Sequence, residues 1–192
     1  LQMRYPSCQT FCIRGGHQSY FLGTSPESLV QLRQGEAYTE ALAGSFAYSP
    51  AARPPEEAQS LALNPRTEAP IGTAPHNPQK RAISTPTPQH APVLDRKTEE
   101  EHRLVVTHLA DRLKALGLCP VFNPQPQVRL LGRLGHWLTP IKALAPPQTH
   151  VLEVVHLLHP TPAVCGTPPA EAQVQIVRLE GFTRGLYTGC LG

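Results

Sequence analysis

Residues 97–117 read KTEEEHRLVVTHLADRLKALG, and this stretch decides which kind of fold the chain can adopt. Apolar side chains recur in it at the three- and four-residue spacing that places them on one face of an α-helix. Gly117 follows the last of them and is a good helix terminator. The residues of this apolar face are Leu104, Val105, Leu109, Leu113 and Leu116.

The start of this helix is rich in acidic residues. Thr98 and Glu101 have the spacing of a capping box, in which each side chain bonds to the other's backbone N–H. Negative charge is also favourable at a helix N-terminus. On local grounds, Glu99, Glu100 and Glu101 are therefore predicted to form a solvated first turn.

The residues before the helix are predicted to form antiparallel strands. The segments QTFCI, SYFLG, SLVQLR and AYTEALA are short and rich in strand-forming residues, and Gly15-Gly16 and Gly35 separate them. Between these strands and the helix, residues 49–92 are rich in proline and poor in large apolar residues. We expect a disordered or extended insertion there, since such a segment buries too little surface to offset its ordering entropy.

The residues after the helix predict one further extended segment, two helices and a last strand. VRLLGRLGHWLTPI is expected to be extended, with Trp137 as an aromatic anchor. A helix at about 149–158 is apolar nearly all round and so is expected to be buried. The next helix, to about Glu180, is expected to have Thr167 as N-cap and Pro168 at its first position, with a strand at GLYTGCLG beyond it. Strands followed by helices indicate the α+β class, in one domain covering residues 1–192.

Charge and hydropathy exclude some classes of function. The net charge is +3, and the lysines and arginines form no stripe of the kind that binds nucleic acid. No apolar run approaches the roughly 20 residues of a membrane span, and the first residues lack the apolar segment of a signal peptide. Both ends of the chain are expected to continue into a longer protein.

The cysteines indicate a reducing compartment rather than a disulfide scaffold. Five cysteines at irregular spacing leave at least one unpaired. Cys8, Cys12 and His17 could form part of a zinc site, but no second pair of ligands completes it. We expect reduced thiols and a cytoplasmic protein, or a plastid one if the source is a plant.

Five segments in order resemble the chorismate-utilising enzymes, and within them the isochorismate synthases. They are FLGTSPESLV (21–30), EALAGS (40–45), the Lys97–His102 segment, GHWLTPI (135–141), and LLHPTPAVCGTP with EGFTRGLYTGCLG (157–168 and 180–192). The resemblance implies a partial chorismate-utilising fold, with antiparallel sheets and helices packed outside them. It also implies a chorismate substrate and a Mg²⁺ cofactor, and it leaves the oligomeric state open.

The reaction that this resemblance implies requires acid–base chemistry. Water adds at C2 of chorismate while the C4 hydroxyl leaves, so one group must accept a proton and another must donate one. By resemblance, Glu27 is the general acid, although taken alone it would be a turn glutamate at the surface. Glu101 by resemblance is a magnesium ligand, which competes with its local interpretation as a helix cap. Lys97 and His102 flank it at matching places and favour the metal.

The remaining implied site residues contact the substrate. Gly44 and Ser45 resemble a carboxylate clamp built from a backbone N–H and a hydroxyl, and Ala43 stands where the aminodeoxychorismate synthases carry a nucleophilic lysine. His159 and Ala163 occupy the bend that favours water over ammonia as nucleophile. Cys165, within that bend, has no implied role.

Three residues depart from the family pattern, and several functional residues fall outside the chain. Ser28, Asp95 and Pro169 replace a common Arg, a usual Ser and a frequent basic residue. The family's basic lysine lies upstream of residue 1, and its second magnesium glutamate and an arginine that binds the enolpyruvyl carboxylate lie downstream of residue 192. The sequence therefore predicts part of an isochorismate synthase serving menaquinone, phylloquinone or siderophore synthesis. A salicylate or anthranilate synthase, or an inactive chorismate-binding remnant, are the alternatives.

Overall fold

The computed structural model describes residues 2–3, 5–6, 8–16, 18–47 and 94–192. The proline-rich insertion predicted at 49–92 lies outside the described residues, as does His17 of the zinc alternative. The described elements are β1 (Gln9–Arg14), β2 (Tyr20–Ser25), β3 (Gln31–Arg33), β4 (Glu36–Ala47), α1 (Arg96–Ala115), β5 (Val121–Phe122), β6 (Gln127–Leu131), β7 (Leu134–Leu144), α2 (Val151–Leu158) and α3 (Pro169–Leu179).

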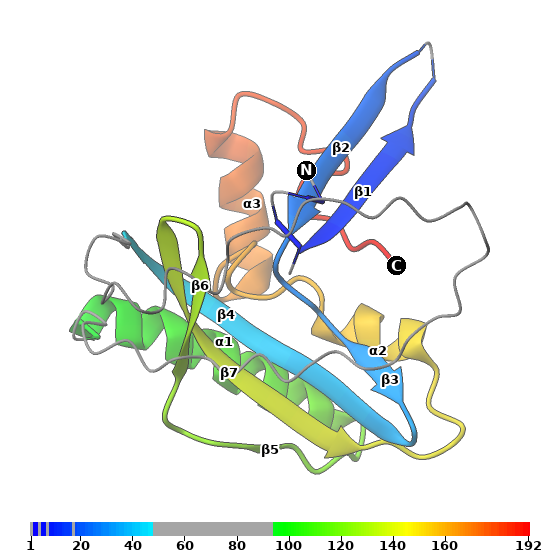
Figure 1. The fold of residues 1–192 in the computed structure, drawn as a ribbon, viewed down its shortest axis with the longest axis vertical. Coiled ribbons are helices and arrows are strands. Elements are labelled where there is room, and N and C mark those ends of the chain that lie inside the picture. Colours follow the sequence, from blue (N-terminus) through cyan, green and yellow to red (C-terminus); the bar gives the residue numbers. More distant parts are fainter. Residues whose placement is uncertain (1, 4, 7, 17, 48–93) are drawn as a thin grey trace, which may run out of the picture.

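The strands form two antiparallel sheets, which confirms the predicted α+β class. β1 and β2 pair as a separate hairpin that projects from the rest of the molecule (Figure 1). The larger sheet has the order β3-β4-β7-β5, and β6 pairs with the other part of β7. Gln34 and Gly35, both with positive φ, connect β3 to β4, as a two-residue hairpin turn of this type requires.

Helix α1 covers one face of the larger sheet, and this contact makes the core (Figure 1). Side chains alternate along a strand, so the odd-numbered residues of β4 and β7 face the helix along most of their length. The predicted helical stripe supplies the other half of the core, and α2 adds two side chains. The buried cluster includes Ala37, Ala41, Ile141 and Ala143 from the sheet, and Val105, Leu109, Leu113, Val154 and Leu158 from the helices.

The residues that cap the N-termini of α1 and α3 differ from the predicted ones. Asp95, rather than Thr98, caps α1, and its carboxylate accepts the Thr98 N–H at 2.9 Å. Thr98 is thus the third residue of the helix, and the predicted capping box with Glu101 is wrong. Pro168 rather than Thr167 is the N-cap of α3. Gly117 ends α1 as predicted, with a φ of 74° that a glycine adopts without strain.

Two expectations for the C-terminal third were wrong. Helix α2 is buried only along the line of Val154 and Leu158, and Leu152 is 66% exposed, because one face alone contacts the core. Residues 185–188 form a turn and residues 189–192 are irregular, so no strand is present there. The Tyr187 N–H donates to the Arg184 carbonyl at 2.8 Å, and Gly185 has a positive φ, so the chain folds back on itself locally.

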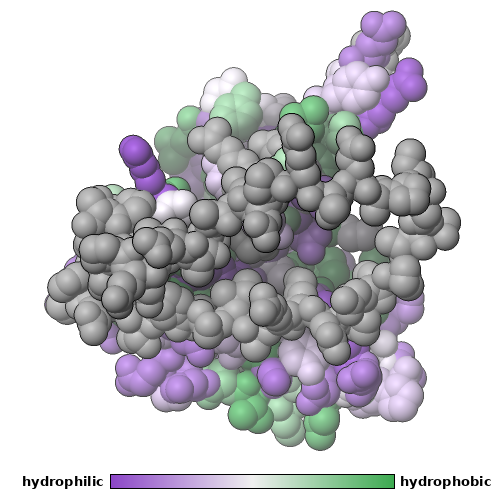
Figure 2. Space-filling view, viewed as in Figure 1, coloured by the Kyte–Doolittle hydropathy of each residue, from purple (hydrophilic) through white to green (hydrophobic). Residues whose placement is uncertain are grey.

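The surface combines polar and apolar regions. Hydrophilic side chains gather at the tip of the β1–β2 hairpin, and a hydrophobic group lies near the middle of the lower edge, between hydrophilic ones (Figure 2). Helix α3 has no buried residue. In the described part of the chain, no helix combines the length and the apolar character needed to cross a bilayer.

Candidate functional site

Glu27 lies in the loop between β2 and β3, where its backbone bonds to Ser25. Its N–H donates to the Ser25 hydroxyl at 3.2 Å, and the side chain is half-buried. Burial raises the pKa of this carboxyl, and the negative charge of Glu40 raises it further. Both causes favour the protonated form, which is the form that a general acid must hold before it donates.

Glu40 and Arg129 form the ion pair that supports this loop. The Arg129 guanidinium donates to both Glu40 oxygens, at 2.6 and 2.8 Å, and to the Pro26 carbonyl at 3.0 Å. Glu40 in turn accepts the Ser28 N–H at 3.2 Å. The side chains are only 27% and 16% exposed, so solvent screens the pair less than a surface pair. Residues on either side of Glu27 are therefore tied to the sheet.

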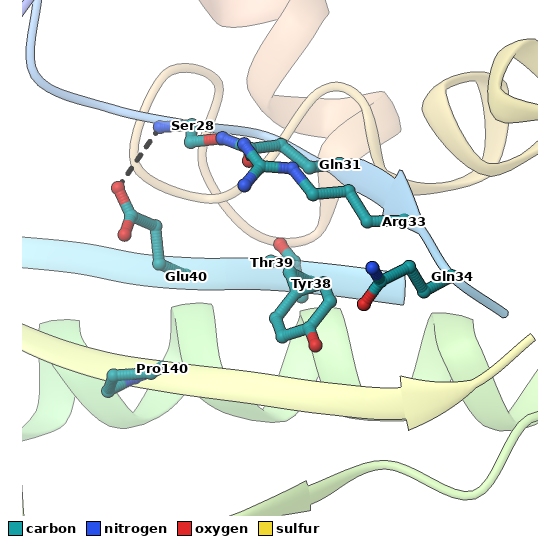
Figure 3. Close-up of a pocket in the computed structure, with 8 residues that line it drawn as sticks. All are labelled: Ser28, Gln31, Arg33, Gln34, Tyr38, Thr39, Glu40 and Pro140. Atoms are coloured by element: carbon teal, nitrogen blue, oxygen red, sulfur yellow. Dashed lines mark hydrogen bonds between the residues drawn. The ribbon is translucent and has the colours of Figure 1, made fainter. Parts of the chain in front are cut away.

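A polar pocket of about 370 Å³ opens beside this ion pair (Figure 3). Ser28, from the Glu27 loop, and Glu40, from β4, both line it, so the pocket adjoins the candidate acid. Most of its lining side chains carry a hydroxyl, amide, guanidinium or carboxylate group, so it offers hydrogen-bond partners to a polar ligand. The other lining residues are Gln31, Arg33, Gln34, Tyr38, Thr39 and Pro140.

Gly44 and Ser45 lie at a β-bulge in β4. Ala43 pairs with Trp137 and Ser45 with His136, so Gly44 has no partner on β7. Gly44 has a φ of 77°, and a Cβ there would lie 2.4 Å from Thr98 Cγ2. Only glycine fits this close approach of strand to helix.

The Ser45 side chain has a partner within the protein. Its Oγ lies 2.8 Å from His136 Nδ1. Burial lowers the pKa of His136, and the nearby Arg129 charge lowers it further. The hydroxyl that the resemblance aims at a substrate thus bonds to a histidine that both effects keep neutral.

Glu101 projects from the first turns of α1 into solvent. Its side chain is 51% exposed and lies 3.5 Å from Lys97 Nζ. A carboxylate of this kind offers the hard oxygen that Mg²⁺ prefers. In the described residues, however, no group of three or more His, Cys, Asp or Glu could hold a metal ion. One carboxylate does not make a magnesium site, and no catalytic step is assigned to a metal.

His102, the next residue, faces the sheet and is only 4% exposed. Its Nε2 lies 2.8 Å from Thr139 Oγ1 on β7, and its Nδ1 lies 3.2 Å from the Ala43 carbonyl on β4. Burial lowers the pKa of this imidazole, and the bond to Ala43 only partly offsets that effect. Helix α1 is therefore joined by a neutral histidine to both central strands of the sheet.

The bend between α2 and α3 contains His159 and Ala163. The Thr161 carbonyl accepts the N–H groups of Val164 and Cys165, at 3.2 and 3.1 Å, which closes a turn. His159 is half-buried at the end of α2, and Ala163 is exposed.

The C-terminal segment supports this bend. Arg184 donates to the Val164 carbonyl at 2.8 Å and pairs with Glu180. The Cys165 sulfur lies 3.7 Å from the Pro169 carbonyl, so it bonds within the bend rather than reaching out of it.

The predicted site residues fall into three groups. Glu27 lies near the Glu40–Arg129 pair. Gly44 packs against Thr98, which belongs to the same helix as Glu101. The third group is His159 and Ala163, which belong to the same bend. Within the described residues, no hydrogen bond or ion pair joins one group to another. Glu40, Arg129 and His136 were not predicted. The only sequence signal for the first two was a charged residue inside an otherwise apolar strand segment.

Comparisons with known proteins show the family to which the chain belongs. The profile of a family described as chorismate binding enzyme matches residues 1–64 and 72–192. The salicylate biosynthesis isochorismate synthase of Pseudomonas aeruginosa is 33% identical over 193 residues, covering all of this chain and 34% of that protein. The chain thus spans about a third of the length of this curated relative.

Solved structures also match. The menaquinone-specific isochorismate synthase MenF of Escherichia coli aligns with a TM-score of 0.58 and 30% identity, over 86% of this chain and 31% of that one. Anthranilate synthase component I of Streptococcus pneumoniae aligns with a TM-score of 0.65 at 22% identity, over 100% of this chain and 35% of that one, and shares the fold.

Proposed function

The chain belongs to the chorismate-binding enzyme family, and on that premise we propose that residues 1–192 form part of the catalytic domain of an isochorismate synthase. The proposal covers the reaction, conversion of chorismate to isochorismate, and the roles of the residues below. It is supported by relatives and solved structures that carry this activity in their names.

The observation that carries the proposal is the setting of Glu27. A half-buried carboxyl beside Glu40, on a loop held by Arg129, adjoins a polar pocket. Burial and the Glu40 charge both raise the pKa of this carboxyl, which favours its protonated form. We assign Glu27 the donation of a proton to the C4 hydroxyl as it leaves.

The other residues bind and orient the substrate in this proposal. Gly44 N–H and the Ser45 hydroxyl bind the ring carboxylate, with Ser45 exchanging its bond to His136 for one to the substrate. His159 and Ala163 lie against the ring and leave room for water. The base that activates this water is a residue outside the described ones.

Magnesium is part of the proposal, through Glu101 alone. Its exposed carboxylate would supply one ligand, and the other ligands would come from residues that the structure does not describe. When bound, Mg²⁺ would neutralise the substrate carboxylate. The five free cysteines support a reducing location such as the cytoplasm.

The test is the Glu27→Gln variant of the whole natural polypeptide that carries this chain. Glutamine keeps the size of the side chain and removes its acidic proton, so kcat for isochorismate formation should fall by about 10²-fold. Glu171→Gln, an exposed glutamate on α3, is the matched control and should leave kcat unchanged.

Four results would contradict the proposal or parts of it. Full activity of the Glu27→Gln variant would remove Glu27 as the acid. Activity that persists in EDTA would show that the reaction does not need magnesium. Pyruvate as a product would point to a salicylate or anthranilate synthase, which the fold shared with anthranilate synthase component I also accommodates. A whole polypeptide with no turnover of chorismate would support the inactive remnant.

A further inference from the structure

His102 is the one ionisable side chain among the buried residues of the described part of the chain. Its neighbour Glu101 is half exposed to solvent, whereas His102 faces the sheet. A buried polar group of this kind is tolerated only if its ring nitrogens are bonded. Both nitrogens of His102 have partners, which makes their geometry informative.

The two partners determine where the ring proton lies. The Ala43 carbonyl can only accept a hydrogen bond, so the Nδ1 that lies 3.2 Å from it must carry the hydrogen. In a neutral ring Nε2 is then an acceptor, and the Thr139 hydroxyl at 2.8 Å donates to it. The geometry therefore places a hydrogen on Nδ1, directed at the Ala43 carbonyl.

The bond to Ala43 has a consequence one residue along the chain. The Ala43 carbonyl and the Gly44 N–H belong to the same peptide group, and in a trans peptide these two bonds point in opposite directions. Since the carbonyl is directed at α1, the Gly44 N–H is directed away from it. Gly44 has no partner on β7 at this bulge, so strand pairing does not fix the orientation of this peptide group.

A second contact fixes the distance between the bulge and the helix. Gly44 packs directly on Thr98, one turn before His102, where a Cβ would lie 2.4 Å from Thr98 Cγ2. The contact and the hydrogen bond lie on either side of Glu101 along α1. Together they hold the helix that carries Glu101 against the strand that carries Gly44.

We propose that His102 is a positioning residue, which holds the Ala43 carbonyl toward α1 and thereby turns the Gly44 N–H outward to receive a substrate carboxylate. The orientation of the peptide stands on the contacts above. The identity of the group received, a carboxylate, rests on the proposed function.

Two conservative substitutions separate the two ring nitrogens. In His102→Asn the side-chain amide can occupy the place of Nδ1 and donate to Ala43, whereas in His102→Gln it reaches the place of Nε2 and meets Thr139. If the bond to Ala43 is the one that matters, asparagine should preserve the bulge and glutamine should not. Thr139→Val tests the other bond, and His156→Gln, an exposed histidine on α2, is the control.

The first measurement is NMR spectroscopy of the chain itself. Ring ¹⁵N shifts should identify His102 as the Nδ1–H tautomer. The backbone ¹⁵N shifts of Gly44 and Ser45 should stay near their original values in His102→Asn and move in His102→Gln. An Nε2–H tautomer, which has no hydrogen on Nδ1, would overturn the proposal. If neither variant folds, the tautomer in the unsubstituted chain and in Thr139→Val still decides the question.

The second measurement is turnover of chorismate by the whole polypeptide. His102→Gln should raise KM about tenfold or more, the effect of one lost hydrogen bond to a charged group, with a smaller change in kcat. His102→Asn should leave KM close to that of the unsubstituted protein. Equal losses in kcat and KM for both variants would mean that His102 only stabilises the fold. If the unsubstituted protein makes no isochorismate, the proposed function fails, while the NMR result still tests the orientation of the Gly44 peptide.

Discussion

The two faces of the larger sheet are held by different forces. Toward α1 the contacts are apolar, apart from the neutral bridge of His102 to Ala43 and Thr139. On the other side, the Glu40–Arg129 ion pair ties the Glu27 loop to the sheet. One face thus relies on close packing and the other on charge, so a change in shape should harm the first and a change in charge the second.

Gly44→Ala should give the largest effect, because it adds volume where strand and helix already touch. The new Cβ meets Thr98 Cγ2, and alanine is strained at a φ of 77°. We expect a loss of about 3 kcal/mol in the free energy of unfolding, measured by urea denaturation.

The control for this substitution removes the atom that the new Cβ would strike. Thr98→Ser lacks Cγ2, so Gly44→Ala should cost clearly less in that background, and the difference measures the coupling. Equal costs in both backgrounds would mean that backbone strain alone explains the effect.

Arg129→Met should give an intermediate effect on the charged face. The substitution keeps the apolar stem but leaves Glu40 without its partner in a half-buried place, and it frees the Pro26 carbonyl. A loss of about 2 kcal/mol in the free energy of unfolding is expected.

The matched control is the exposed ion pair on α1. Lys97→Met breaks the ion pair with Glu101, in which the Lys97 side chain is 86% exposed and the Glu101 side chain 51%. This substitution should lower the free energy of unfolding by no more than about 0.5 kcal/mol. Similar losses for the two variants would contradict the idea that burial makes the Glu40–Arg129 pair important.

Glu27→Gln should give the smallest effect on stability, and its sign depends on pH. Burial and Glu40 raise the pKa of Glu27 in the folded state, so the folded protein binds this proton more tightly than the unfolded chain does. The resulting stability is present below the ordinary glutamate pKa of about 4.3 and is lost as pH rises through the raised value. Glutamine stays neutral, so the variant should gain melting temperature relative to the original protein at pH 7 and match it near pH 4.

Thermal unfolding at a series of pH values measures this difference. A variant that is less stable than the original at pH 7 would show that the ionised form of Glu27 has a stabilising partner. In that case burial and the Glu40 charge would not explain how Glu27 stays protonated to act as the acid.

Local sequence patterns predicted most elements of the fold. The apolar stripe of α1, the four strands before it and the glycine that ends it were all readable, because each depends on neighbours within a few residues. The capping residue was misassigned, since Asp95 and Thr98 are both good caps and only the backbone shows which one precedes the helix. The strand predicted at 185–192 failed because no neighbouring strand is there to pair with it among the described residues.

The candidate site was predictable only as a set of separate residues. Glu27, Gly44, Ser45, Glu101, His159 and Ala163 were named from motifs, and their roles remain predictions. Arg129 was missed because its partner Glu40 lies 89 residues away in the sequence, a distance over which no local pattern connects two charges.

The sequence by itself therefore determined which segments are helical or extended, and which family the motifs resemble, because these follow from residue spacing. Tertiary structure alone decided which charge is paired, which histidine is neutral and which way the Gly44 peptide faces. Glu101 and His102 are consecutive in the chain, yet one is 51% exposed and the other 4%. The difference arises because a helix turns about 100° per residue, and only packing against the sheet determines which side is buried.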